Sequence, residues 1–85
     1  MNIKYNNTTY AIPKPFNECY FGSNPVKDMT ITYPYSNDSA KLPAFAVAIY
    51  DAIKGAEHTE DYTTVQRGLD WFSKNFTKQY YTLLD

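Results

Sequence analysis

Residues 43–55, PAFAVAIYDAIKG, constrain the fold more than any other stretch, because only Asp51 and Lys54 carry charge there. Pro43 suits the first turn of a helix, and Gly55 suits a left-handed cap at its end. The large apolar residues recur at helical spacing: Phe45, Ile49 and Ile53. A helix that is apolar on nearly every side is buried on most of them. We therefore expect a central helix over residues 43–55, against which the other elements pack.

The length of the chain and the order of its patterns indicate the fold class. A chain of 85 residues forms one small domain, so we expect a single domain over residues 1–85. Strand patterns fill the first 35 residues, and helical patterns follow. Strands that precede helices are typical of an α+β fold. We expect a small antiparallel sheet, covered on one face by two C-terminal helices.

Residues 1–13 have the pattern of a β-hairpin. Asn6 and Asn7 tolerate the positive φ angles of a tight primed turn. A two-residue turn there places six residues on one face of the hairpin. The expected pairs are Tyr5 with Thr8, Ile3 with Tyr10 and Met1 with Ile12.

Two further strands are expected before the central helix. Residues 16–21 are predicted to form a short strand that carries Cys19. Residues 29–35 alternate between apolar and polar, which is typical of a half-buried strand. Pro34 should place the end of this strand at a sheet edge, because proline cannot donate to a ladder. Residues 36–39 are polar and are predicted to be a loop.

A second helix is expected after the acidic linker 56–61. Its apolar stripe steps by three and four residues through Tyr62, Val65, Leu69, Phe72 and Phe76. Thr63 and Gln66 fit a capping box at its start, and acids just before it suit the positive end of a helix. The stripe continues through Tyr80 and Leu83, but residues 78–84 suit a final strand equally well.

The back of this second helix is the candidate binding surface. At 100° per residue, Trp71 lies about 140° from the centre of the apolar stripe. Arg67, Lys74 and Lys78 fall on the same face. Trp and Arg often anchor interfaces, so we predict that these four residues bind a partner. We predict that Tyr33 and Tyr35 also contact the partner, as a second region of the binding surface. In the alternative interpretation, the hairpin or a C-terminal strand covers Trp71.

No residue pattern in the chain indicates catalysis, a metal site or a cofactor. Cys19 has no histidine near it in the sequence, and His58 stands alone in an acidic linker. The net charge of −1 makes no general case for binding nucleic acid or an anionic membrane. A single cysteine suits a reducing compartment. The N-terminal stretch is polar, so we expect no signal peptide there. We expect a non-enzymatic protein of the bacterial cytoplasm with no bound cofactor or metal.

In general character, as a small, aromatic, motif-free single domain, the chain resembles phage- or mobile-element-encoded proteins that bind and block a host factor. This resemblance implies a protein-binding module that inhibits a bacterial host or defence protein. A second hypothesis is a nucleic-acid or nucleotide binder that stacks bases on Trp71 and tyrosines, with Lys and Arg on the phosphates. A third is a structural or assembly subunit that oligomerises.

Overall fold

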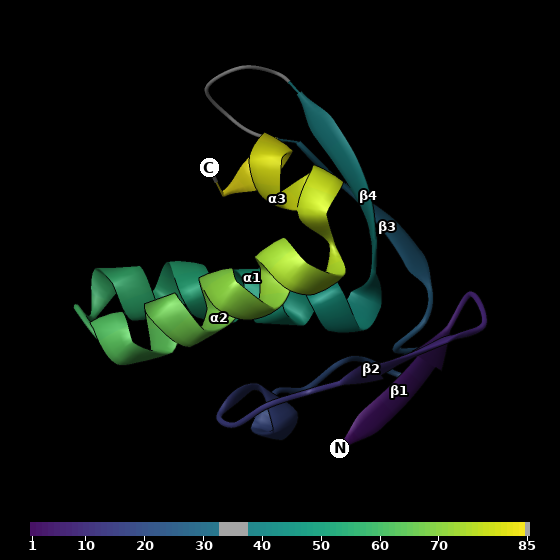
Figure 1. Ribbon diagram of the computed structural model, residues 1–85, viewed down its shortest axis with the longest axis horizontal. Helices are drawn as coiled ribbons and strands as arrows, with labels where there is room; N and C mark the ends of the chain where they lie inside the picture. The colour runs from purple at the N-terminus through teal and green to yellow at the C-terminus, as the bar shows by residue number, and fades with distance from the viewer. Residues whose placement is uncertain (33–37, 85) are drawn as a thin grey trace.

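Two antiparallel strand pairs and three α-helices form the described part of the chain, residues 1–32 and 38–84 of a computed structural model (Figure 1). The elements are β1 (Asn2–Tyr5), β2 (Thr8–Ala11), the 3-10 helix η1 (Phe16–Glu18), β3 (Asp28–Thr32), β4 (Ser39–Pro43), α1 (Ala44–His58), α2 (Tyr62–Asn75) and α3 (Thr77–Leu83). The α+β prediction is confirmed. The single sheet is a wrong prediction, because β1–β2 and β3–β4 are separate sheets.

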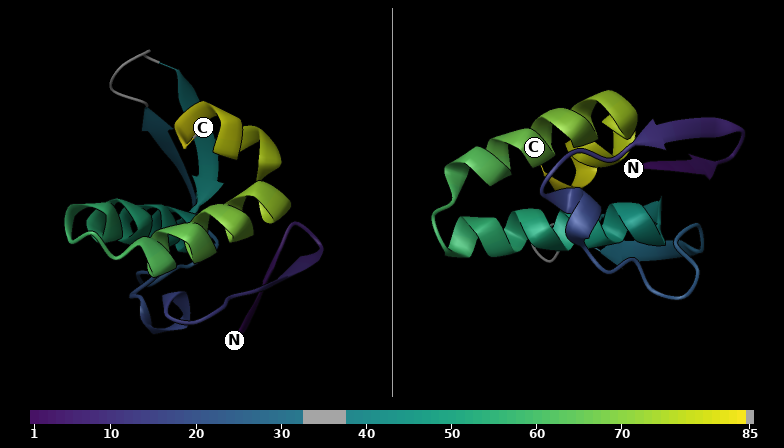
Figure 2. Two further views of the ribbon diagram at one scale, coloured as in Figure 1. Left: turned by 60° about the vertical axis from the view of Figure 1, so that its left-hand side comes forward. Right: turned by 90° about the horizontal axis from the view of Figure 1, so that it is seen from below.

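The helices α1 and α2 lie side by side at the centre of the molecule, and the two sheets lie on opposite sides of them (Figures 1 and 2). The β1–β2 hairpin and η1 are on one side. The β3–β4 pair and α3 are on the other, where α3 contacts β4. Each two-stranded sheet is marginal by itself, so both depend on packing against the helices.

The predicted burial of α1 is confirmed, since Phe45, Ile49 and Ile53 have no solvent exposure. The predicted end at Gly55 is wrong, because α1 continues to His58. The left-handed residue is Glu60, with φ of 59°. Its N–H donates to the Glu57 carbonyl at 3.2 Å, and the Asp61 N–H donates to the Ala56 carbonyl at 2.9 Å. These two hydrogen bonds form a Schellman motif that ends the helix.

The N-terminal hairpin forms in the predicted register. Asn6 and Asn7 have φ angles of 49° and 64°, as a primed two-residue turn requires. Tyr5 pairs with Thr8 and Ile3 with Tyr10. The Ile12 N–H donates to the Met1 carbonyl at 2.8 Å, which continues the pairing to the start of the chain.

The remaining strand predictions need correction. Residues 16–21 contain η1 instead of a strand, because Phe16 turns inward and is fully buried. The loop predicted at 36–39 is wrong at Ser39, where the unpredicted strand β4 begins, and β4 pairs along the whole of β3. Residues 33–37 lie outside the described residues, and with them lie Tyr33, Tyr35, the edge position of Pro34 and the end of the predicted strand 29–35.

The C-terminal third is helical but broken. Phe72 and Phe76 of the predicted stripe are buried, whereas Tyr62 is 65% exposed. Helix α2 ends at Asn75, and residues 77–83 form α3, so the strand alternative is wrong. At the break, the Asn75 side chain donates to the Trp71 carbonyl at 2.8 Å, and the Thr77 hydroxyl donates to the Ser73 carbonyl at 2.7 Å. The Thr77 hydroxyl thereby satisfies a carbonyl that the Thr77 N–H would bond in a continuous helix, while the Phe76 ring is buried in the core.

The start of α2 also differs from the capping-box prediction. Asp61 is the capping residue, and its carboxylate accepts from the Thr64 N–H at 3.3 Å and from the Thr64 hydroxyl at 2.6 Å. These hydrogen bonds favour the charged form and lower the pKa of Asp61.

We expect Asp61→Ala to lower the melting temperature at neutral pH, because it removes this cap. The pKa of the carboxyl is lower in the folded state than in the unfolded chain. The stabilisation is therefore present above the unfolded pKa and is lost as the pH falls through the folded pKa. Thermal melts from pH 7 down to pH 2 should show the two proteins converging. A difference in melting temperature that stays constant over this range would contradict the role of the charged cap.

Candidate functional site

Trp71 is buried, so the prediction that it is exposed on the back of the second helix is wrong. Its side chain is 6% exposed, and its indole N–H donates to the Ala11 carbonyl at 2.8 Å. The rings of Phe72, Phe76 and Phe45 lie 5.3, 5.6 and 6.3 Å from it, centroid to centroid. The alternative interpretation, in which the hairpin covers Trp71, is the correct one.

The basic residues predicted around Trp71 lie on two helices, Arg67 and Lys74 on α2 and Lys78 on α3. The Arg67 guanidinium donates to the Lys14 carbonyl at 3.5 Å, so it helps to hold the segment that follows β2. Lys74 is exposed on α2. Lys78 is on α3, because the break at Phe76 takes it off the α2 helix. The predicted face therefore holds the chain's own residues 11–14, and Trp71 is not available to a partner there.

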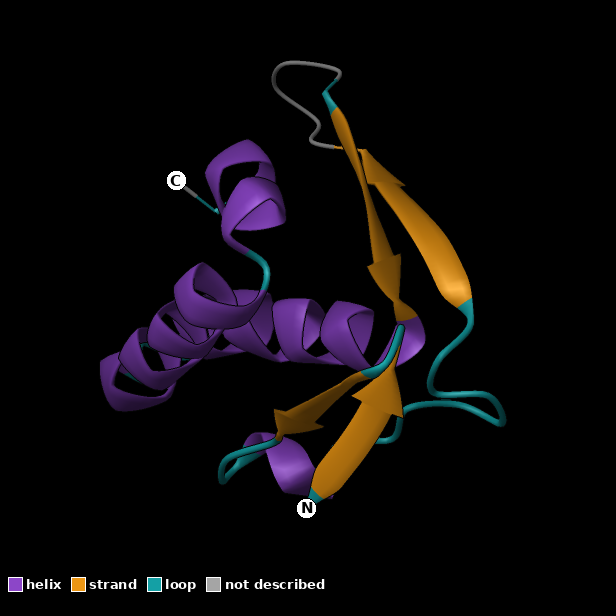
Figure 3. Cartoon of the chain, turned by 45° about the vertical axis from the view of Figure 1, so that its right-hand side comes forward, coloured by secondary structure: helices purple, strands orange, loops and turns teal. Residues whose placement is uncertain are grey.

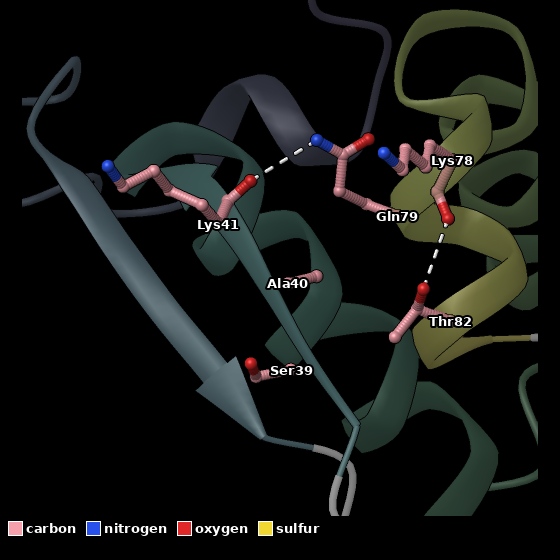
Figure 4. Close-up of a pocket in the computed structure, with 6 residues that line it drawn as sticks. All are labelled: Ser39, Ala40, Lys41, Lys78, Gln79 and Thr82. Carbon is pink, nitrogen blue, oxygen red and sulfur yellow. Dashed lines mark hydrogen bonds between the residues drawn. The ribbon is translucent and has the colours of Figure 1, made fainter.

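A pocket of about 280 Å³ lies between β4 and α3 (Figure 4). Its lining residues are Ser39, Ala40, Lys41, Lys78, Gln79 and Thr82. The Gln79 amide donates across it to the Lys41 carbonyl at 3.2 Å, and the Thr82 hydroxyl donates to the Lys78 carbonyl at 3.3 Å. The Lys41 side chain points away from α3 (Figure 4). This pocket is small, and Gln79 bridges it. The Gln79 hydrogen bond holds α3 beside the outer edge of β4.

The opposite edge of the same sheet, along β3, is open. The Ala44 N–H donates to the Lys27 carbonyl at 2.8 Å. This bond makes Lys27 and Ala44 a hydrogen-bonded pair. Since bonded and non-bonded pairs alternate in an antiparallel ladder, the next bonded pairs are Met29 with Leu42 and Ile31 with Ala40. The backbone groups of the other β3 residues then point away from β4: Asp28, Thr30 and Thr32. No described strand pairs with this edge (Figure 3).

This β3 edge, defined by the outward backbone groups of residues 28–32, is the candidate interface. Four of its five residues are exposed, and Met29 is an exposed large apolar side chain, at 41%. The segment DMTIT contains no Lys, Arg or Pro. The alternation of residues 29–35 predicted this strand, but residues 36–39 predicted a loop where β4 begins, so the open edge could not be predicted from the sequence.

Groups that could carry chemistry are separate from one another. Partial burial raises the pKa of the Cys19 thiol, with a smaller contribution from Glu18, so the reactive thiolate is disfavoured. His58 is exposed at the end of α1. Asp51 is exposed, and partial desolvation by neighbouring atoms raises the pKa of its carboxyl. Within residues 1–32 and 38–84, no group of three or more His, Cys, Asp or Glu side chains could hold a metal ion.

Comparison with family models, with characterised proteins and with solved structures found no match for this chain. In the part of the chain that the structure describes, every helix is too short or too polar to cross a membrane. The function must therefore be inferred from the surfaces themselves.

Proposed function

We propose that this protein is a non-enzymatic protein-binding module that accepts an extended segment of another protein at the β3 edge. The observation that carries the proposal is the open edge of a two-stranded sheet whose other edge is covered by α3. In strand addition, main-chain hydrogen bonds supply affinity, and side chains on alternate positions supply specificity.

The residues of β3 fit this role. Asp28, Thr30 and Thr32 each offer an N–H and a C=O to an added strand. Natural proteins usually protect such edges with lysine, proline or a bulge. Strand β3 contains no lysine and no proline. Met29, at 41% exposure, gives an incoming strand an apolar side chain to pack against.

The burial of Trp71 favours protein binding over nucleic-acid binding. The nucleic-acid hypothesis used Trp71 and exposed tyrosines to stack bases, with cations beside them. Trp71 is 6% exposed and offers no face for a base, so only tyrosines such as Tyr20 and Tyr62 could take that role. Within the proposal, the partner is a bacterial host or defence protein that the chain inhibits. The general character of the sequence, a small, aromatic, motif-free single domain, favours this class of partner.

Thr30→Pro tests the proposal without breaking the β3–β4 ladder, because the lost N–H points outward. Asn2→Pro is the matched control, since the Asn2 N–H points outward from the β1–β2 hairpin. Proteins captured by the wild type from a bacterial lysate should be purified, and their affinities for all three proteins measured by calorimetry. We expect Thr30→Pro to weaken binding at least about tenfold, as the loss of one backbone hydrogen bond and a steric clash would.

Hydrogen exchange locates the contact independently. The amides of Thr30 and Thr32 should exchange more slowly when the purified partner is bound. Equal binding by the wild type and Thr30→Pro, or unchanged exchange at β3, would contradict the proposal. Capture of nucleic acid alone, with a steep dependence on salt, would favour the nucleic-acid hypothesis instead.

A further inference from the structure

We infer that the segment accepted at the β3 edge carries an acidic side chain opposite Thr30, with an apolar residue on each side of it, and that Lys41 recognises the acid. This recognition rests on the proposed function, because it names the chemistry of the segment that the edge binds. Three observations carry it: the direction of the Lys41 side chain, the two faces of the sheet, and a hydrogen bond from Tyr5 to Asp28 at one end of the edge.

The Lys41 ammonium lies on the β3 side of the sheet. Lys41 and Thr30 form a non-hydrogen-bonded pair, in which the side chains share one face and approach most closely. The lysine side chain leaves β4 away from α3 (Figure 4), and β3 pairs with β4 on that side. Thr30 is short, so the longer lysine reaches over it toward the open edge. Among the described residues the only ion pair joins Lys54 and Glu57, so Lys41 has no carboxylate of its own.

An added strand places one of its residues opposite Thr30 and on the same face of the sheet as Lys41. Since neighbouring strands lie about 4.8 Å apart, the Cα of this residue would be about 10 Å from the Lys41 Cα, two strands away. A lysine and a glutamate that extend toward each other span this distance and form a direct ion pair. A lysine or arginine at the same position would meet a like charge, which is unfavourable.

The two flanking residues of the added strand point to the other face of the sheet. On that face they lie beside Met29 and Ile31. Met29 is 41% exposed, and Ile31 is half-buried against the core. Apolar side chains at the flanking positions would remove this apolar surface from water. The segment that fits the edge therefore alternates in the order apolar, acidic, apolar.

The chain's own hairpin lies at the Asp28 end of the edge. The Tyr5 hydroxyl donates to the Asp28 carboxylate at 2.5 Å, and the Tyr5 ring packs against Phe45 with 6.1 Å between centroids. Asp28 is two positions before Thr30 and therefore on the same face. A partner acid opposite Asp28 would meet a like charge, whereas an acid opposite Thr30 meets Lys41. These two charges fix the position of the acid along the edge.

Titration with capped synthetic peptides, followed by the amide chemical shifts in nuclear magnetic resonance, tests this recognition. The peptides have the sequence STTVXVTTS, in which X is Glu, Gln or Lys. We expect the shifts to map to Thr30 and Thr32. The Glu peptide should bind about two- to fivefold more tightly than the Gln peptide, as exposed ion pairs allow, and the Lys peptide should bind most weakly. The preference should shrink at high salt, because exposed charges are screened.

Substitution of Lys41 assigns the preference to this side chain. Lys41→Glu should reverse the order, so that the Lys peptide binds most tightly, and Lys41→Gln should remove it. Lys41 is exposed, and it is its carbonyl that bonds Gln79, so both variants should fold, as circular dichroism and thermal melts will show. Lys14→Glu is the matched control, because it makes the same change of charge at an exposed residue after β2. It should keep the order of the wild type.

The outcomes separate this recognition from the proposed function. Equal binding of the three peptides at β3 would overturn the preference for an acid and leave strand addition intact. An order that persists in Lys41→Glu would overturn the role of Lys41. If no peptide shifts the β3 amides at up to about 5 mM, the chemistry assigned to the segment is wrong, and partner binding by Thr30→Pro still decides the proposed function. Shifts at Thr30 and Thr32 that depend on protein concentration alone would place a second copy on the edge instead of an acidic segment.

Discussion

Replacing Trp71 with alanine should lower the free energy of unfolding by about 3–5 kcal/mol, the usual cost of deleting a large buried aromatic side chain. Trp71 is 6% exposed and joins three parts of the fold. Its ring packs against Phe45 of α1 and Phe72 of α2, and its N–H bonds the Ala11 carbonyl of β2 at 2.8 Å. A domain of this size has only a few kcal/mol to spare, so the variant should be largely unfolded at 37 °C.

Trp71→Phe is the control that separates packing from hydrogen bonding. It keeps an aromatic ring but leaves the Ala11 carbonyl without its donor, which should cost about 1–3 kcal/mol. Urea unfolding followed by far-ultraviolet circular dichroism measures all three proteins without relying on tryptophan fluorescence. A Trp71→Ala protein as stable as the wild type would show that the hairpin does not pack on α2 as described.

Replacing Gly68 with alanine should destabilise the protein by about 1–3 kcal/mol, as overpacking of a core does. A Cβ atom at this position would lie 2.3 Å from Ile53 Cγ1 and 3.0 Å from Phe16 Cζ. Both of these side chains are fully buried, so neither can move aside freely. Gly68 therefore sets how closely α2 approaches α1 and η1.

Gly55→Ala is the matched control, because Gly55 lies inside α1 and a Cβ there would meet nothing within 4 Å. Alanine is favoured over glycine inside a helix by about 1 kcal/mol, so this variant should be more stable than the wild type. Thermal and urea unfolding should place the two variants on opposite sides of the wild type. If Gly68→Ala is stabilising, the close packing of α2 on α1 is wrong.

The features that depend only on neighbouring residues could be predicted from the sequence. Asn6 and Asn7 dictate a primed turn, and the turn sets the hairpin register, because both effects act within a few residues. The near-absence of charge between residues 43 and 55 dictates a buried helix. The α+β class follows from the order of these patterns.

Tertiary structure alone decided where Trp71 lies, where α2 breaks and which edge stays open. The periodicity of α2 places Trp71 opposite the main stripe, but a helix can be covered on two sides, and only the docking of the hairpin 60 positions away buries it. The helix breaks after Phe76 because burial of this ring in the aromatic cluster and the hydrogen bond from the Thr77 hydroxyl to the Ser73 carbonyl offset the lost helical bonds. The β3 edge is open because β4 takes one side and α3 covers β4. These outcomes depend on contacts between distant segments, which no local pattern encodes.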